Sequence, residues 1–308
     1  MDLTIGSRGS KLALTQSNMV ADLLKKHHRD LDVKIEIIKT KGDIILDVAL
    51  SKIGDKGLFV KEIEQALLDG HVDLAIHSLK DMPTLQPHGL KIAAIPEREE
   101  PSDVLIAKSI HSLHTLPPRA RVATSSLRRT AQLLAARPDL QIEDIRGNVE
   151  TRLQKFYDSD LDGMILAYAG LKRLGLTEHI STVLSPFELM PAPAQGALAL
   201  QIRESDHQTN SLLQAIHDLQ AWNQATAERA FLQTLEGGCQ TPVAAWCEEK
   251  KEQTILHGRL LSLDGQQSLD GSLAVDPGNP AQAGKTLAET ILQRGGTRIL
   301  EEIRAIES

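Results

Sequence analysis

The sequence predicts an α/β protein of two lobes followed by a small C-terminal α+β domain. Short apolar runs alternate with helix-period segments over the first two thirds of the chain, which is typical of α/β sheets. Two proline-containing segments, 96–101 and 186–196, interrupt this alternation and bracket one stretch, as expected if the chain crosses twice between lobes. From about residue 217 the pattern changes, and 308 residues are more than one ordinary core needs.

The elements of the first lobe follow from their apolar periods. Strands are expected at residues 3–7, 33–40 and 72–78, and helices at 11–28, capped by Ser10, and 57–69, ended by Gly70. The run 72–78, VDLAIHS, is almost continuously apolar, which is typical of a strand buried on both faces. Because strands alternate with helices, we expect a parallel sheet.

The second lobe repeats this alternation, and the C-terminal part departs from it. Strands are expected at 121–125, 141–146 and 162–170, and helices at 126–138, with Ser126 near the N-cap, 147–156 and 171–175. After the second break, residues 196–203 are again strand-like. Beyond them we expect helices at 228–235, 284–295 and 297–305 and strands at 244–250 and 254–263, with turns at Asp264-Gly265 and Asp270-Gly271. These patterns predict domain 1 at 1–96 with 197–216, domain 2 at 97–196 and domain 3 at 217–308.

Composition excludes several classes of protein. Aromatic residues make up 3% of the chain and the net charge is −7, which argues against nucleic-acid binding. No apolar run approaches the ~20 residues of a membrane-spanning helix. The start, MDLTIGSRGSKLAL, lacks a secretion signal, so we expect a cytoplasmic protein. The two cysteines, Cys239 and Cys247, form no disulfide framework, and no CxxC or HExxH motif predicts a metal site.

Basic residues follow nearly every predicted strand of both lobes. Ligands of parallel α/β sheets bind beyond the carboxyl ends of the strands, where helix N-termini present free N–H groups. The residues at these positions are Arg8, Ser10, Lys80, Asp81, Ser126, Arg128, Arg129, Arg146, Gly147, Asn148, Arg152, Lys172 and Arg173. For each arginine alone, a solvated helix position or a surface ion pair is the alternative. Arg128 and Arg129, however, oppose the dipole of their helix at ~0.3–1 kcal/mol each unless an anion is present. The set therefore predicts a ligand with several anionic groups.

Asp81 and Cys239 stand out within this pattern. Asp81 is the one carboxylate among these bases, either an N-cap or partner of Lys80, or an acid/base group that stabilises a cationic intermediate. Cys239 follows Gly237-Gly238 on a predicted loop that can approach a ligand closely, and a thiolate is a good nucleophile. In contrast, Cys247 and His77 lie in predicted strands and are expected to be packed in the core.

Eight motifs occur in order between residues 7 and 242: SRGSKLAL (7–14), KGDIILDVALSKIGDKGLFVKEIE (41–64), HSLKDMP (77–83), ATSSLRR (123–129), IRGNVETR (145–152), ILAYAGLKRLG (165–175), PAPAQGA (191–197) and LEGGCQTP (235–242). Together they resemble the porphobilinogen deaminase family. The resemblance implies a transferase of tetrapyrrole (heme) biosynthesis that joins four porphobilinogen molecules head to tail on a covalently bound dipyrromethane primer. It releases ammonia at each addition and finally hydrolyses off hydroxymethylbilane. The resemblance also implies a monomer whose two lobes form a type II periplasmic-binding-protein-like clamshell.

The resemblance further implies roles for individual residues. Cys239 would carry the dipyrromethane through a thioether, and Asp81 would stabilise the cationic methylene-pyrrolenine that forms when ammonia leaves. The carboxylates of the primer are expected to bind Lys80, Thr124, Ser126, Arg128, Arg129, Gly147 and Arg152. The substrate or elongating chain is expected to face Arg8, Ser10, Phe59, Arg146, Arg152, Arg173 and Gln195. Residues 41–59, around Lys52 and Lys56, resemble a mobile flap, and Gln201 stands where the family commonly has an acid. No metal is implied.

Two other classes of protein remain as alternatives. A non-enzymatic two-lobed anionic-solute-binding protein would explain the arginines but neither LEGGCQTP nor the third domain. A phosphate-transferring enzyme would use the helix N-termini, but the sequence has no GxxxxGK[ST] loop.

Overall fold

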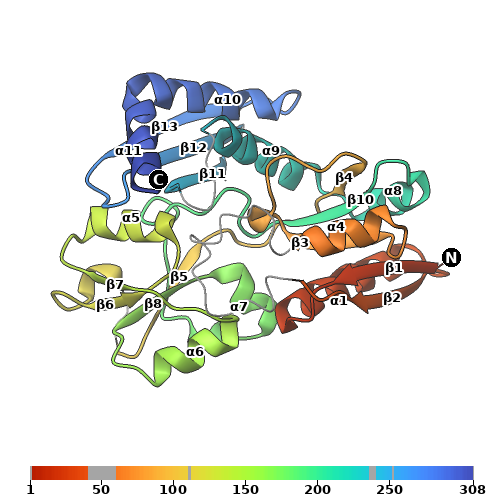
Figure 1. Cartoon of the computed structure of the whole chain (residues 1–308), viewed down its shortest axis with the longest axis horizontal. Helices are drawn as coiled ribbons and strands as arrows, with labels where there is room; N and C mark the ends of the chain where they lie inside the picture. Colours follow the sequence, from red (N-terminus) through yellow and green to blue (C-terminus); the bar gives the residue numbers. More distant parts are fainter. Residues whose placement is uncertain (1, 41–59, 110–111, 236–240, 252, 308) are drawn as a thin grey trace. The chain divides into compact units, whose positions relative to one another are not determined.

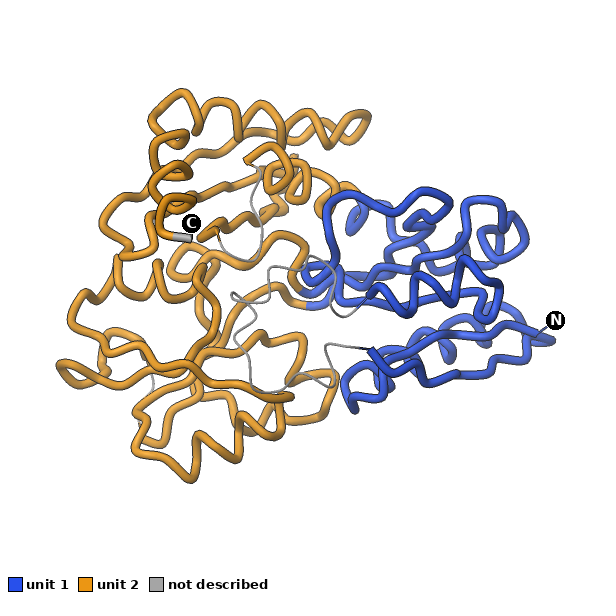
Figure 2. The backbone as a smooth tube through the Cα atoms, in the orientation of Figure 1, with its two compact units in different colours: residues 1–99, 196–222 blue, residues 100–195, 223–308 orange. Residues whose placement is uncertain are grey.

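The chain folds into two compact units, which Figures 1 and 2 show. The computed structural model describes residues 2–40, 60–109, 112–235, 241–251 and 253–307. The first unit comprises residues 1–99 and 196–222, and the second comprises 100–195 and 223–308. Each unit therefore joins segments that lie far apart in the sequence.

The first unit, here called the first lobe, is a five-stranded sheet in the order β2-β1-β3-β10-β4 with helices on both faces. Helix α1 packs against Leu74 and Ile76 of β3, whereas α4 packs against Ala75 of the same strand. Because neighbouring residues of a strand point to opposite faces, the two helices cover opposite faces of the sheet. The elements are β1 (Asp2–Ser7), α1 (Lys11–His27), β2 (Asp32–Ile37), α4 (Lys61–Leu68), β3 (Leu74–Ser78), η1 (Leu79–Asp81), β4 (Leu90–Ala94), β10 (Leu198–Arg203), α8 (His207–Leu213) and η4 (Gln214–Ile216).

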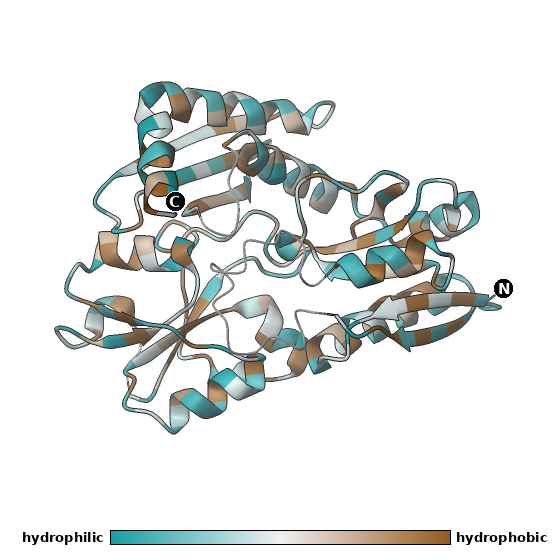
Figure 3. Cartoon of the chain, in the orientation of Figure 1, coloured by the Kyte–Doolittle hydropathy of each residue, from teal (hydrophilic) through white to brown (hydrophobic). Residues whose placement is uncertain are grey.

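The predicted helix boundaries of this lobe have clear local causes. Ser10 is the N-cap of α1, and its side-chain oxygen accepts a hydrogen bond from the Ala13 N–H (3.3 Å). Gly70 follows α4 with φ of 73°, a backbone conformation that glycine adopts without strain. Both predictions are confirmed, and α4 and α6 show the alternating apolar and polar stripes of helices with one buried face (Figure 3).

The second lobe, residues 100–195 of the second unit, is a five-stranded sheet in the order β7-β6-β8-β5-β9. Val104, Ala123 and Met164 pack with α6 on one face, and Leu105, Val122 and Ile165 pack with α5 in a separate cluster. The elements are β5 (Asp103–Ala107), η2 (Leu113–Thr115), β6 (Arg121–Ala123), α5 (Leu127–Ala136), β7 (Gln141–Glu143), α6 (Val149–Tyr157), β8 (Gly163–Ala167), α7 (Tyr168–Leu174), η3 (Thr177–His179) and β9 (Thr182–Val183).

The two lobes share one pattern of strand directions. In each sheet the first three strands are parallel, and the fourth strand, β10 or β5, runs antiparallel to both its neighbours. The expectation of parallel sheets is therefore wrong for this fourth strand. β5 and β10 are the first strands after each crossing of the chain, so no crossover helix within the lobe requires them to be parallel.

The C-terminal part of the second unit is a three-stranded antiparallel sheet, β11-β12-β13, covered by helices. Phe231, Leu256, Leu260, Leu287 and Ile291 form the centre of its core. The elements are α9 (Leu219–Thr234), β11 (Val243–Glu249), β12 (Thr254–Leu261), β13 (Ser268–Val275), α10 (Pro280–Ile291), a π-helical segment (Leu292–Gly296) and α11 (Thr297–Glu307).

Several local predictions differ from the structure. The helix expected at 228–235 begins at Leu219, and strands β4, β5 and β9 and helix α8 were not expected. The pair Asp270-Gly271 lies inside β13 and forms no turn. The glycine at this position allows α10 to pack closely on the strand, since a Cβ there would lie 2.7 Å from Leu287 Cδ1. The strand expected at 162–170 ends at Ala167, where α7 begins with Tyr168. The Asp264-Gly265 turn is confirmed, with φ of 71° at Gly265.

The predicted fold class, two α/β lobes and a small C-terminal α+β domain, is confirmed. The three-domain division with the boundaries given above stays a prediction. None of the helices in the described ranges combines the length and the apolar stretch needed to cross a bilayer. Nor do the described residues contain a group of three or more His, Cys, Asp or Glu side chains placed to hold a metal ion.

Candidate active site

One edge of the first lobe collects the predicted residues that follow β1 and β3. These strands are parallel neighbours, so Arg8 and Ser10 after β1 and Lys80 and Asp81 after β3 lie at the same edge of the sheet. The turn η1 is held by two buried neighbours, since Leu79 and Met82 are almost completely buried on either side of the Lys80-Asp81 pair. Asp81 is exposed, whereas Lys80 and Arg8 are half-buried. This edge thus presents one accessible carboxylate beside two cations.

Behind this edge, His77 is a buried core residue. Its Nε2 lies 3.1 Å from Gln201 Oε1, and Gln201 Nε2 donates in turn to Glu64 Oε1 (3.0 Å) and Gln86 Oε1 (2.9 Å). Burial lowers the pKa of His77 to about 4, so the imidazole is neutral at pH 7. The prediction that His77 packs in the core is confirmed. Cys247 is buried in β11 in the same way.

The second lobe collects its predicted residues in the same manner. β7, β6 and β8 are parallel neighbours, so the segments that follow them lie along one edge. The Ser125 hydroxyl donates to Ile145 O (2.6 Å) and accepts from Ile145 N (3.2 Å), which ties the segment after β6 to the segment after β7. Arg146 Nε donates to Asp144 Oδ2 (2.8 Å). Arg152 on α6 and Arg173 on α7 are half-buried.

Local backbone geometry shapes the start of α6. Position 147 favours glycine for two reasons. Its φ is 120°, and a Cβ there would lie 2.8 Å from Thr151 Cγ2. Asn148 caps the helix by accepting from Thr151 N (2.8 Å). The exposed Gly147 backbone can therefore approach a ligand without a side chain in between.

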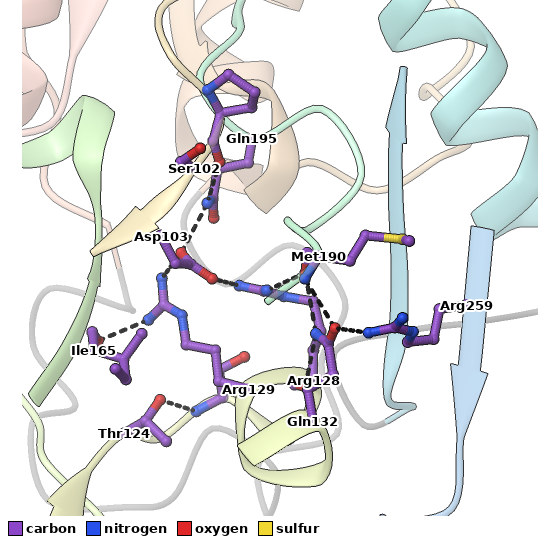
Figure 4. Close-up of polar contacts among 12 residues, drawn as sticks. Ser102, Asp103, Thr124, Arg128, Arg129, Gln132, Ile165, Met190, Gln195 and Arg259 are labelled. Atoms are coloured by element: carbon purple, nitrogen blue, oxygen red, sulfur yellow. Dashed lines mark hydrogen bonds and ion pairs between the residues drawn. The ribbon is translucent and has the colours of Figure 1, made fainter. Parts of the chain in front are cut away.

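The first turn of α5 carries the most buried cations of the predicted set. Arg128 and Arg129 are 6% and 7% exposed, and Figure 4 shows both guanidinium groups turned toward Asp103 at the start of β5. Arg128 Nη2 lies 2.8 Å from Asp103 Oδ2, and Arg129 Nη2 lies 2.7 Å from Asp103 Oδ1. Backbone carbonyls take a second N–H of each arginine, Met190 O for Arg128 (2.6 Å) and Ile165 O for Arg129 (3.1 Å).

Three other predicted residues surround this cluster. Gln195 is fully buried, and its Nε2 donates to Asp103 Oδ1 (2.8 Å) and to Pro101 O (2.6 Å). Thr124 is also buried, and its Oγ1 accepts from Ser126 N (3.2 Å). Ser126 is the N-cap of α5, but its side chain makes no capping hydrogen bond. The side chains of Gln195 and Thr124 are thus occupied within the lobe.

Asp103 is absent from the residues predicted from the sequence. An acid in the first position of an apolar run, DVLIA, directly after Pro101-Ser102, was the available signal, because a charge entering a buried strand needs a partner. Burial raises the pKa of Asp103, but the charges of Arg128 and Arg129 and the hydrogen bonds from Arg129 and Gln195 outweigh it. The net result is a pKa well below the usual range, so the carboxylate is ionised at pH 7.

Several predicted site residues lie outside the described residues. They are Cys239, Phe59 and the segment 41–59 with Lys52 and Lys56. The described parts of the two lobes offer two sets of cations at strand ends, one with an exposed carboxylate and one with a buried carboxylate. Such sets can bind anionic groups by charge-assisted hydrogen bonds.

Comparisons with known proteins cover nearly the whole chain. The family model "Porphobilinogen deaminase, dipyromethane cofactor binding domain" matches residues 3–211, and "Porphobilinogen deaminase, C-terminal domain" matches residues 222–293. The porphobilinogen deaminase of Syntrophomonas wolfei subsp. wolfei is 52% identical over 303 residues, covering 98% of this chain and 99% of that protein. That of Carboxydothermus hydrogenoformans is 49% identical over 303 residues, covering 98% and 97%. Among solved structures, the methionine-binding protein MetQ aligns with a TM-score of 0.46 at 14% identity, covering 74% of this chain and 94% of that one.

Proposed function

The chain belongs to the porphobilinogen deaminase family, and from this premise we propose that its clustered cations bind the carboxylates of a dipyrromethane primer and of the chain that grows from it. The protein is a hydroxymethylbilane synthase, a transferase of tetrapyrrole biosynthesis that condenses four porphobilinogen molecules, releases ammonia and hydrolyses off the linear product. The alternative of a non-enzymatic anionic-solute-binding protein is not favoured by these relatives.

The observation that carries the site assignment is the buried cluster of Arg128, Arg129 and Asp103. Two guanidinium groups and one carboxylate together carry one net positive charge, and all three side chains are nearly or fully buried. Among the described residues, Arg129 Nε is also buried without a hydrogen-bond acceptor. A buried excess of positive charge with a free donor fits an anionic ligand such as a primer carboxylate.

The remaining cations extend this assignment. Arg152, Lys80, Ser126, Thr124 and Gly147 are proposed to complete the primer site together with Cys239, the thioether anchor in the proposed third domain. Arg8, Ser10, Arg146, Arg152, Arg173, Gln195 and Phe59 are proposed to face the substrate or the growing chain. When bound, dipyrromethane would supply the terminal pyrrole carbon to which the first porphobilinogen unit is joined. Thr124 and Gln195 contribute by holding neighbouring groups in place, because their side chains are buried and bonded within the lobe.

Asp81 is proposed to be the catalytic carboxylate. Its position on a turn between buried Leu79 and Met82 keeps an accessible carboxyl side chain in a fixed place. Positive charge develops on the substrate pyrrole when ammonia leaves, and a nearby carboxylate stabilises that charge and accepts hydrogen bonds from the pyrrole N–H. We also propose that the enzyme acts as a monomer in the cytoplasm on porphobilinogen, without a metal, nucleic acid or membrane partner.

Intact mass and peptide mapping of the purified protein test the anchor and the catalytic group separately. We expect a mass excess of one dipyrromethane on Cys239, no such excess in Cys239→Ser, and a normal excess in Asp81→Asn. Asp81→Asn should lose at least about a hundredfold in kcat, as removal of general acid–base and charge-stabilising groups commonly does. Near-normal turnover by Asp81→Asn would remove Asp81 from the mechanism, and primer on Cys239→Ser would place the anchor elsewhere.

A further inference from the structure

Within the described residues, Asp103 is the acid that Arg128 and Arg129 share. Its side chain is 0% exposed, and each oxygen faces a different arginine at 2.7–2.8 Å. Gln195 Nε2 adds a further donor to Oδ1 (2.8 Å), as Figure 4 shows. A carboxylate buried in this way is strongly unfavourable unless such donors surround it, so its presence calls for a role that an apolar residue could not fill.

The contacts of Asp103 set the direction of both guanidinium groups. A guanidinium is a planar fork, and two fixed acceptors on it define its plane. For Arg128 these acceptors are Asp103 Oδ2 and Met190 O, and for Arg129 they are Asp103 Oδ1 and Ile165 O. The N–H groups that remain therefore point in directions that the lobe determines before any ligand arrives.

Asp103 also sets the charge of the cluster. Without it, two buried guanidinium groups would stand side by side with no carboxylate between them. With it, one net positive charge remains, which matches one ligand carboxylate. Gln195 Nε2, on the segment that leaves the second lobe, donates both to Asp103 Oδ1 and to Pro101 O on the segment that enters it.

We infer that Asp103 is a positioning residue for primer binding: it holds Arg128 and Arg129 in the orientation, and at the net charge, that accept a carboxylate of the dipyrromethane. This inference rests on the proposed assignment of both arginines to the primer. It goes further by giving a role to a residue that does not itself contact the primer.

The test compares variants that separate charge from shape. Asp103→Asn keeps the shape of the side chain and removes its charge, whereas Asp103→Glu keeps the charge. The control is Asp139→Asn, which removes another carboxylate of the second lobe. Asp139 binds Arg137 through both oxygens and contacts neither Arg128 nor Arg129. Each holoenzyme is purified, its folded fraction is measured by near-UV circular dichroism, and its primer occupancy is measured by intact mass. We expect Asp103→Asn to retain about a tenth of the wild-type occupancy or less, Asp103→Glu to retain about half or more, and Asp139→Asn to match the wild type.

A second measurement distinguishes positioning from packing. Asp103→Ala is incubated with porphobilinogen in the presence of formate or of chloride at equal ionic strength, and the rate of primer attachment is followed by mass. Formate supplies a carboxylate that fits the vacated space, so we expect it to raise the rate about fivefold or more over chloride. A residue that only packs would show no difference between the two anions.

The outcomes separate this inference from the proposed function. Normal occupancy in Asp103→Asn together with loss of primer in Arg128→Lys would overturn the role of Asp103 and leave the arginine assignment standing. Normal occupancy in both variants would overturn the role of Asp103 and the arginine assignment together. If neither Asp103→Asn nor Asp103→Glu folds, Asp103 is a residue of the folded core and the positioning role is overturned.

Discussion

Two buried residues, His77 and Asp103, show two ways in which this protein accommodates a titratable side chain in its core. His77 is neutral because burial outweighs its hydrogen bond to Gln201, whereas Asp103 is ionised because two arginines outweigh its burial. Gln201 links the buried polar groups of the first lobe, because its amide contacts His77, Glu64 and Gln86 at once. Both groups are therefore deprotonated at pH 7, but the result is a neutral imidazole at His77 and a charged carboxylate at Asp103, because burial dominates at the first site and the arginines dominate at the second.

The pH dependence of stability should report on His77. Its pKa is about 4 in the folded chain and 6.5 when unfolded, so the unfolded state binds more protons between these values. The free energy of unfolding is therefore unaffected by His77 above pH 6.5, and it decreases as the pH falls from 6.5 toward 4. Between pH 7 and pH 5 we expect the wild type to lose about 2 kcal/mol more free energy of unfolding than His77→Gln. Urea unfolding at both pH values measures this, with exposed His71→Gln as the control. Equal losses in wild type and His77→Gln would contradict the assignment.

Arg128 should depend on the shape of its side chain as well as its charge. Lysine keeps the positive charge for Asp103 but cannot contact Asp103 and Met190 O together as a planar fork does. We expect Arg128→Lys to fold, with a free energy of unfolding lowered by about 1–2 kcal/mol, and to carry primer on about a tenth of molecules or fewer. Denaturant unfolding and intact mass measure the two effects, with Arg137→Lys, which pairs with Asp139, as the control. A fully primed Arg128→Lys would show that charge alone suffices.

At the level of whole elements, close backbone contacts join helices and turns. Gly284 on α10 lies against α9, so that a Cβ there would come within 2.6 Å of Phe231 N and closer still to Ala227 O. Gly265, in the turn before β13, lies in the same way against the backbone of α5 at Ala131 and Ala135. Arg259 of β12 adds a hydrogen bond to Gln132 Oε1 of α5 (2.9 Å). The C-terminal sheet therefore packs directly on the helix that carries Arg128 and Arg129.

The contact between α9 and α10 should be sensitive to one methyl group. Alanine stabilises a helix by about 1 kcal/mol relative to glycine. In Gly284→Ala, however, α9 and α10 must move apart, which lowers the free energy of unfolding by about 1–3 kcal/mol or more. We expect a net loss of stability, measured as a lower midpoint of thermal unfolding. Gly170→Ala on α7 is the control, since its Cβ would meet only Val149 Cγ2, at 3.9 Å, and its midpoint should be unchanged or higher. A higher midpoint for Gly284→Ala would contradict this packing.

At the level of the whole molecule, positive charge is local and the balance is negative. The chain carries 41 acidic and 34 basic Lys and Arg side chains, a net charge of −7, yet arginines and lysines follow strand after strand at the proposed site. An anionic substrate is thus repelled by the chain as a whole and attracted by local cations. Salt screens both effects, and the short-range attraction dominates binding.

The salt dependence of the Michaelis constant should reveal this local attraction. Raising the salt concentration from about 0.05 M to about 0.5 M should raise the KM for porphobilinogen several-fold, because charge-assisted contacts weaken. The kcat should change less, since the cations bind the acidic side chains of the substrate, away from the reacting carbon. Steady-state assays measure both constants, with sucrose at equal osmolality as the control. A KM that stays constant with salt would contradict binding by exposed or half-buried cations.

Periodicity and motifs in the sequence were sufficient for the fold class and the family, but not for every element, since strands β4, β5 and β9 and helix α8 were not expected. The site residues that the motifs indicate stay predictions. Apolar spacing, Ser10 before α1 and Gly70 after α4 are local signals. They can be recognised from sequence because they involve residues that are close together in the chain. The motifs around Asp81 and Cys239 are local in the same sense.

Only the tertiary structure decided which groups neutralise one another. Asp103 lies 25 residues from Arg128, and Gln195 lies 92 residues from Asp103, so no spacing rule could pair them. The antiparallel direction of β5 and β10 and the extended Gly271 likewise depend on neighbours from distant parts of the chain. Burial and electrostatic pairing act through space, and they are set when distant segments meet in the folded chain.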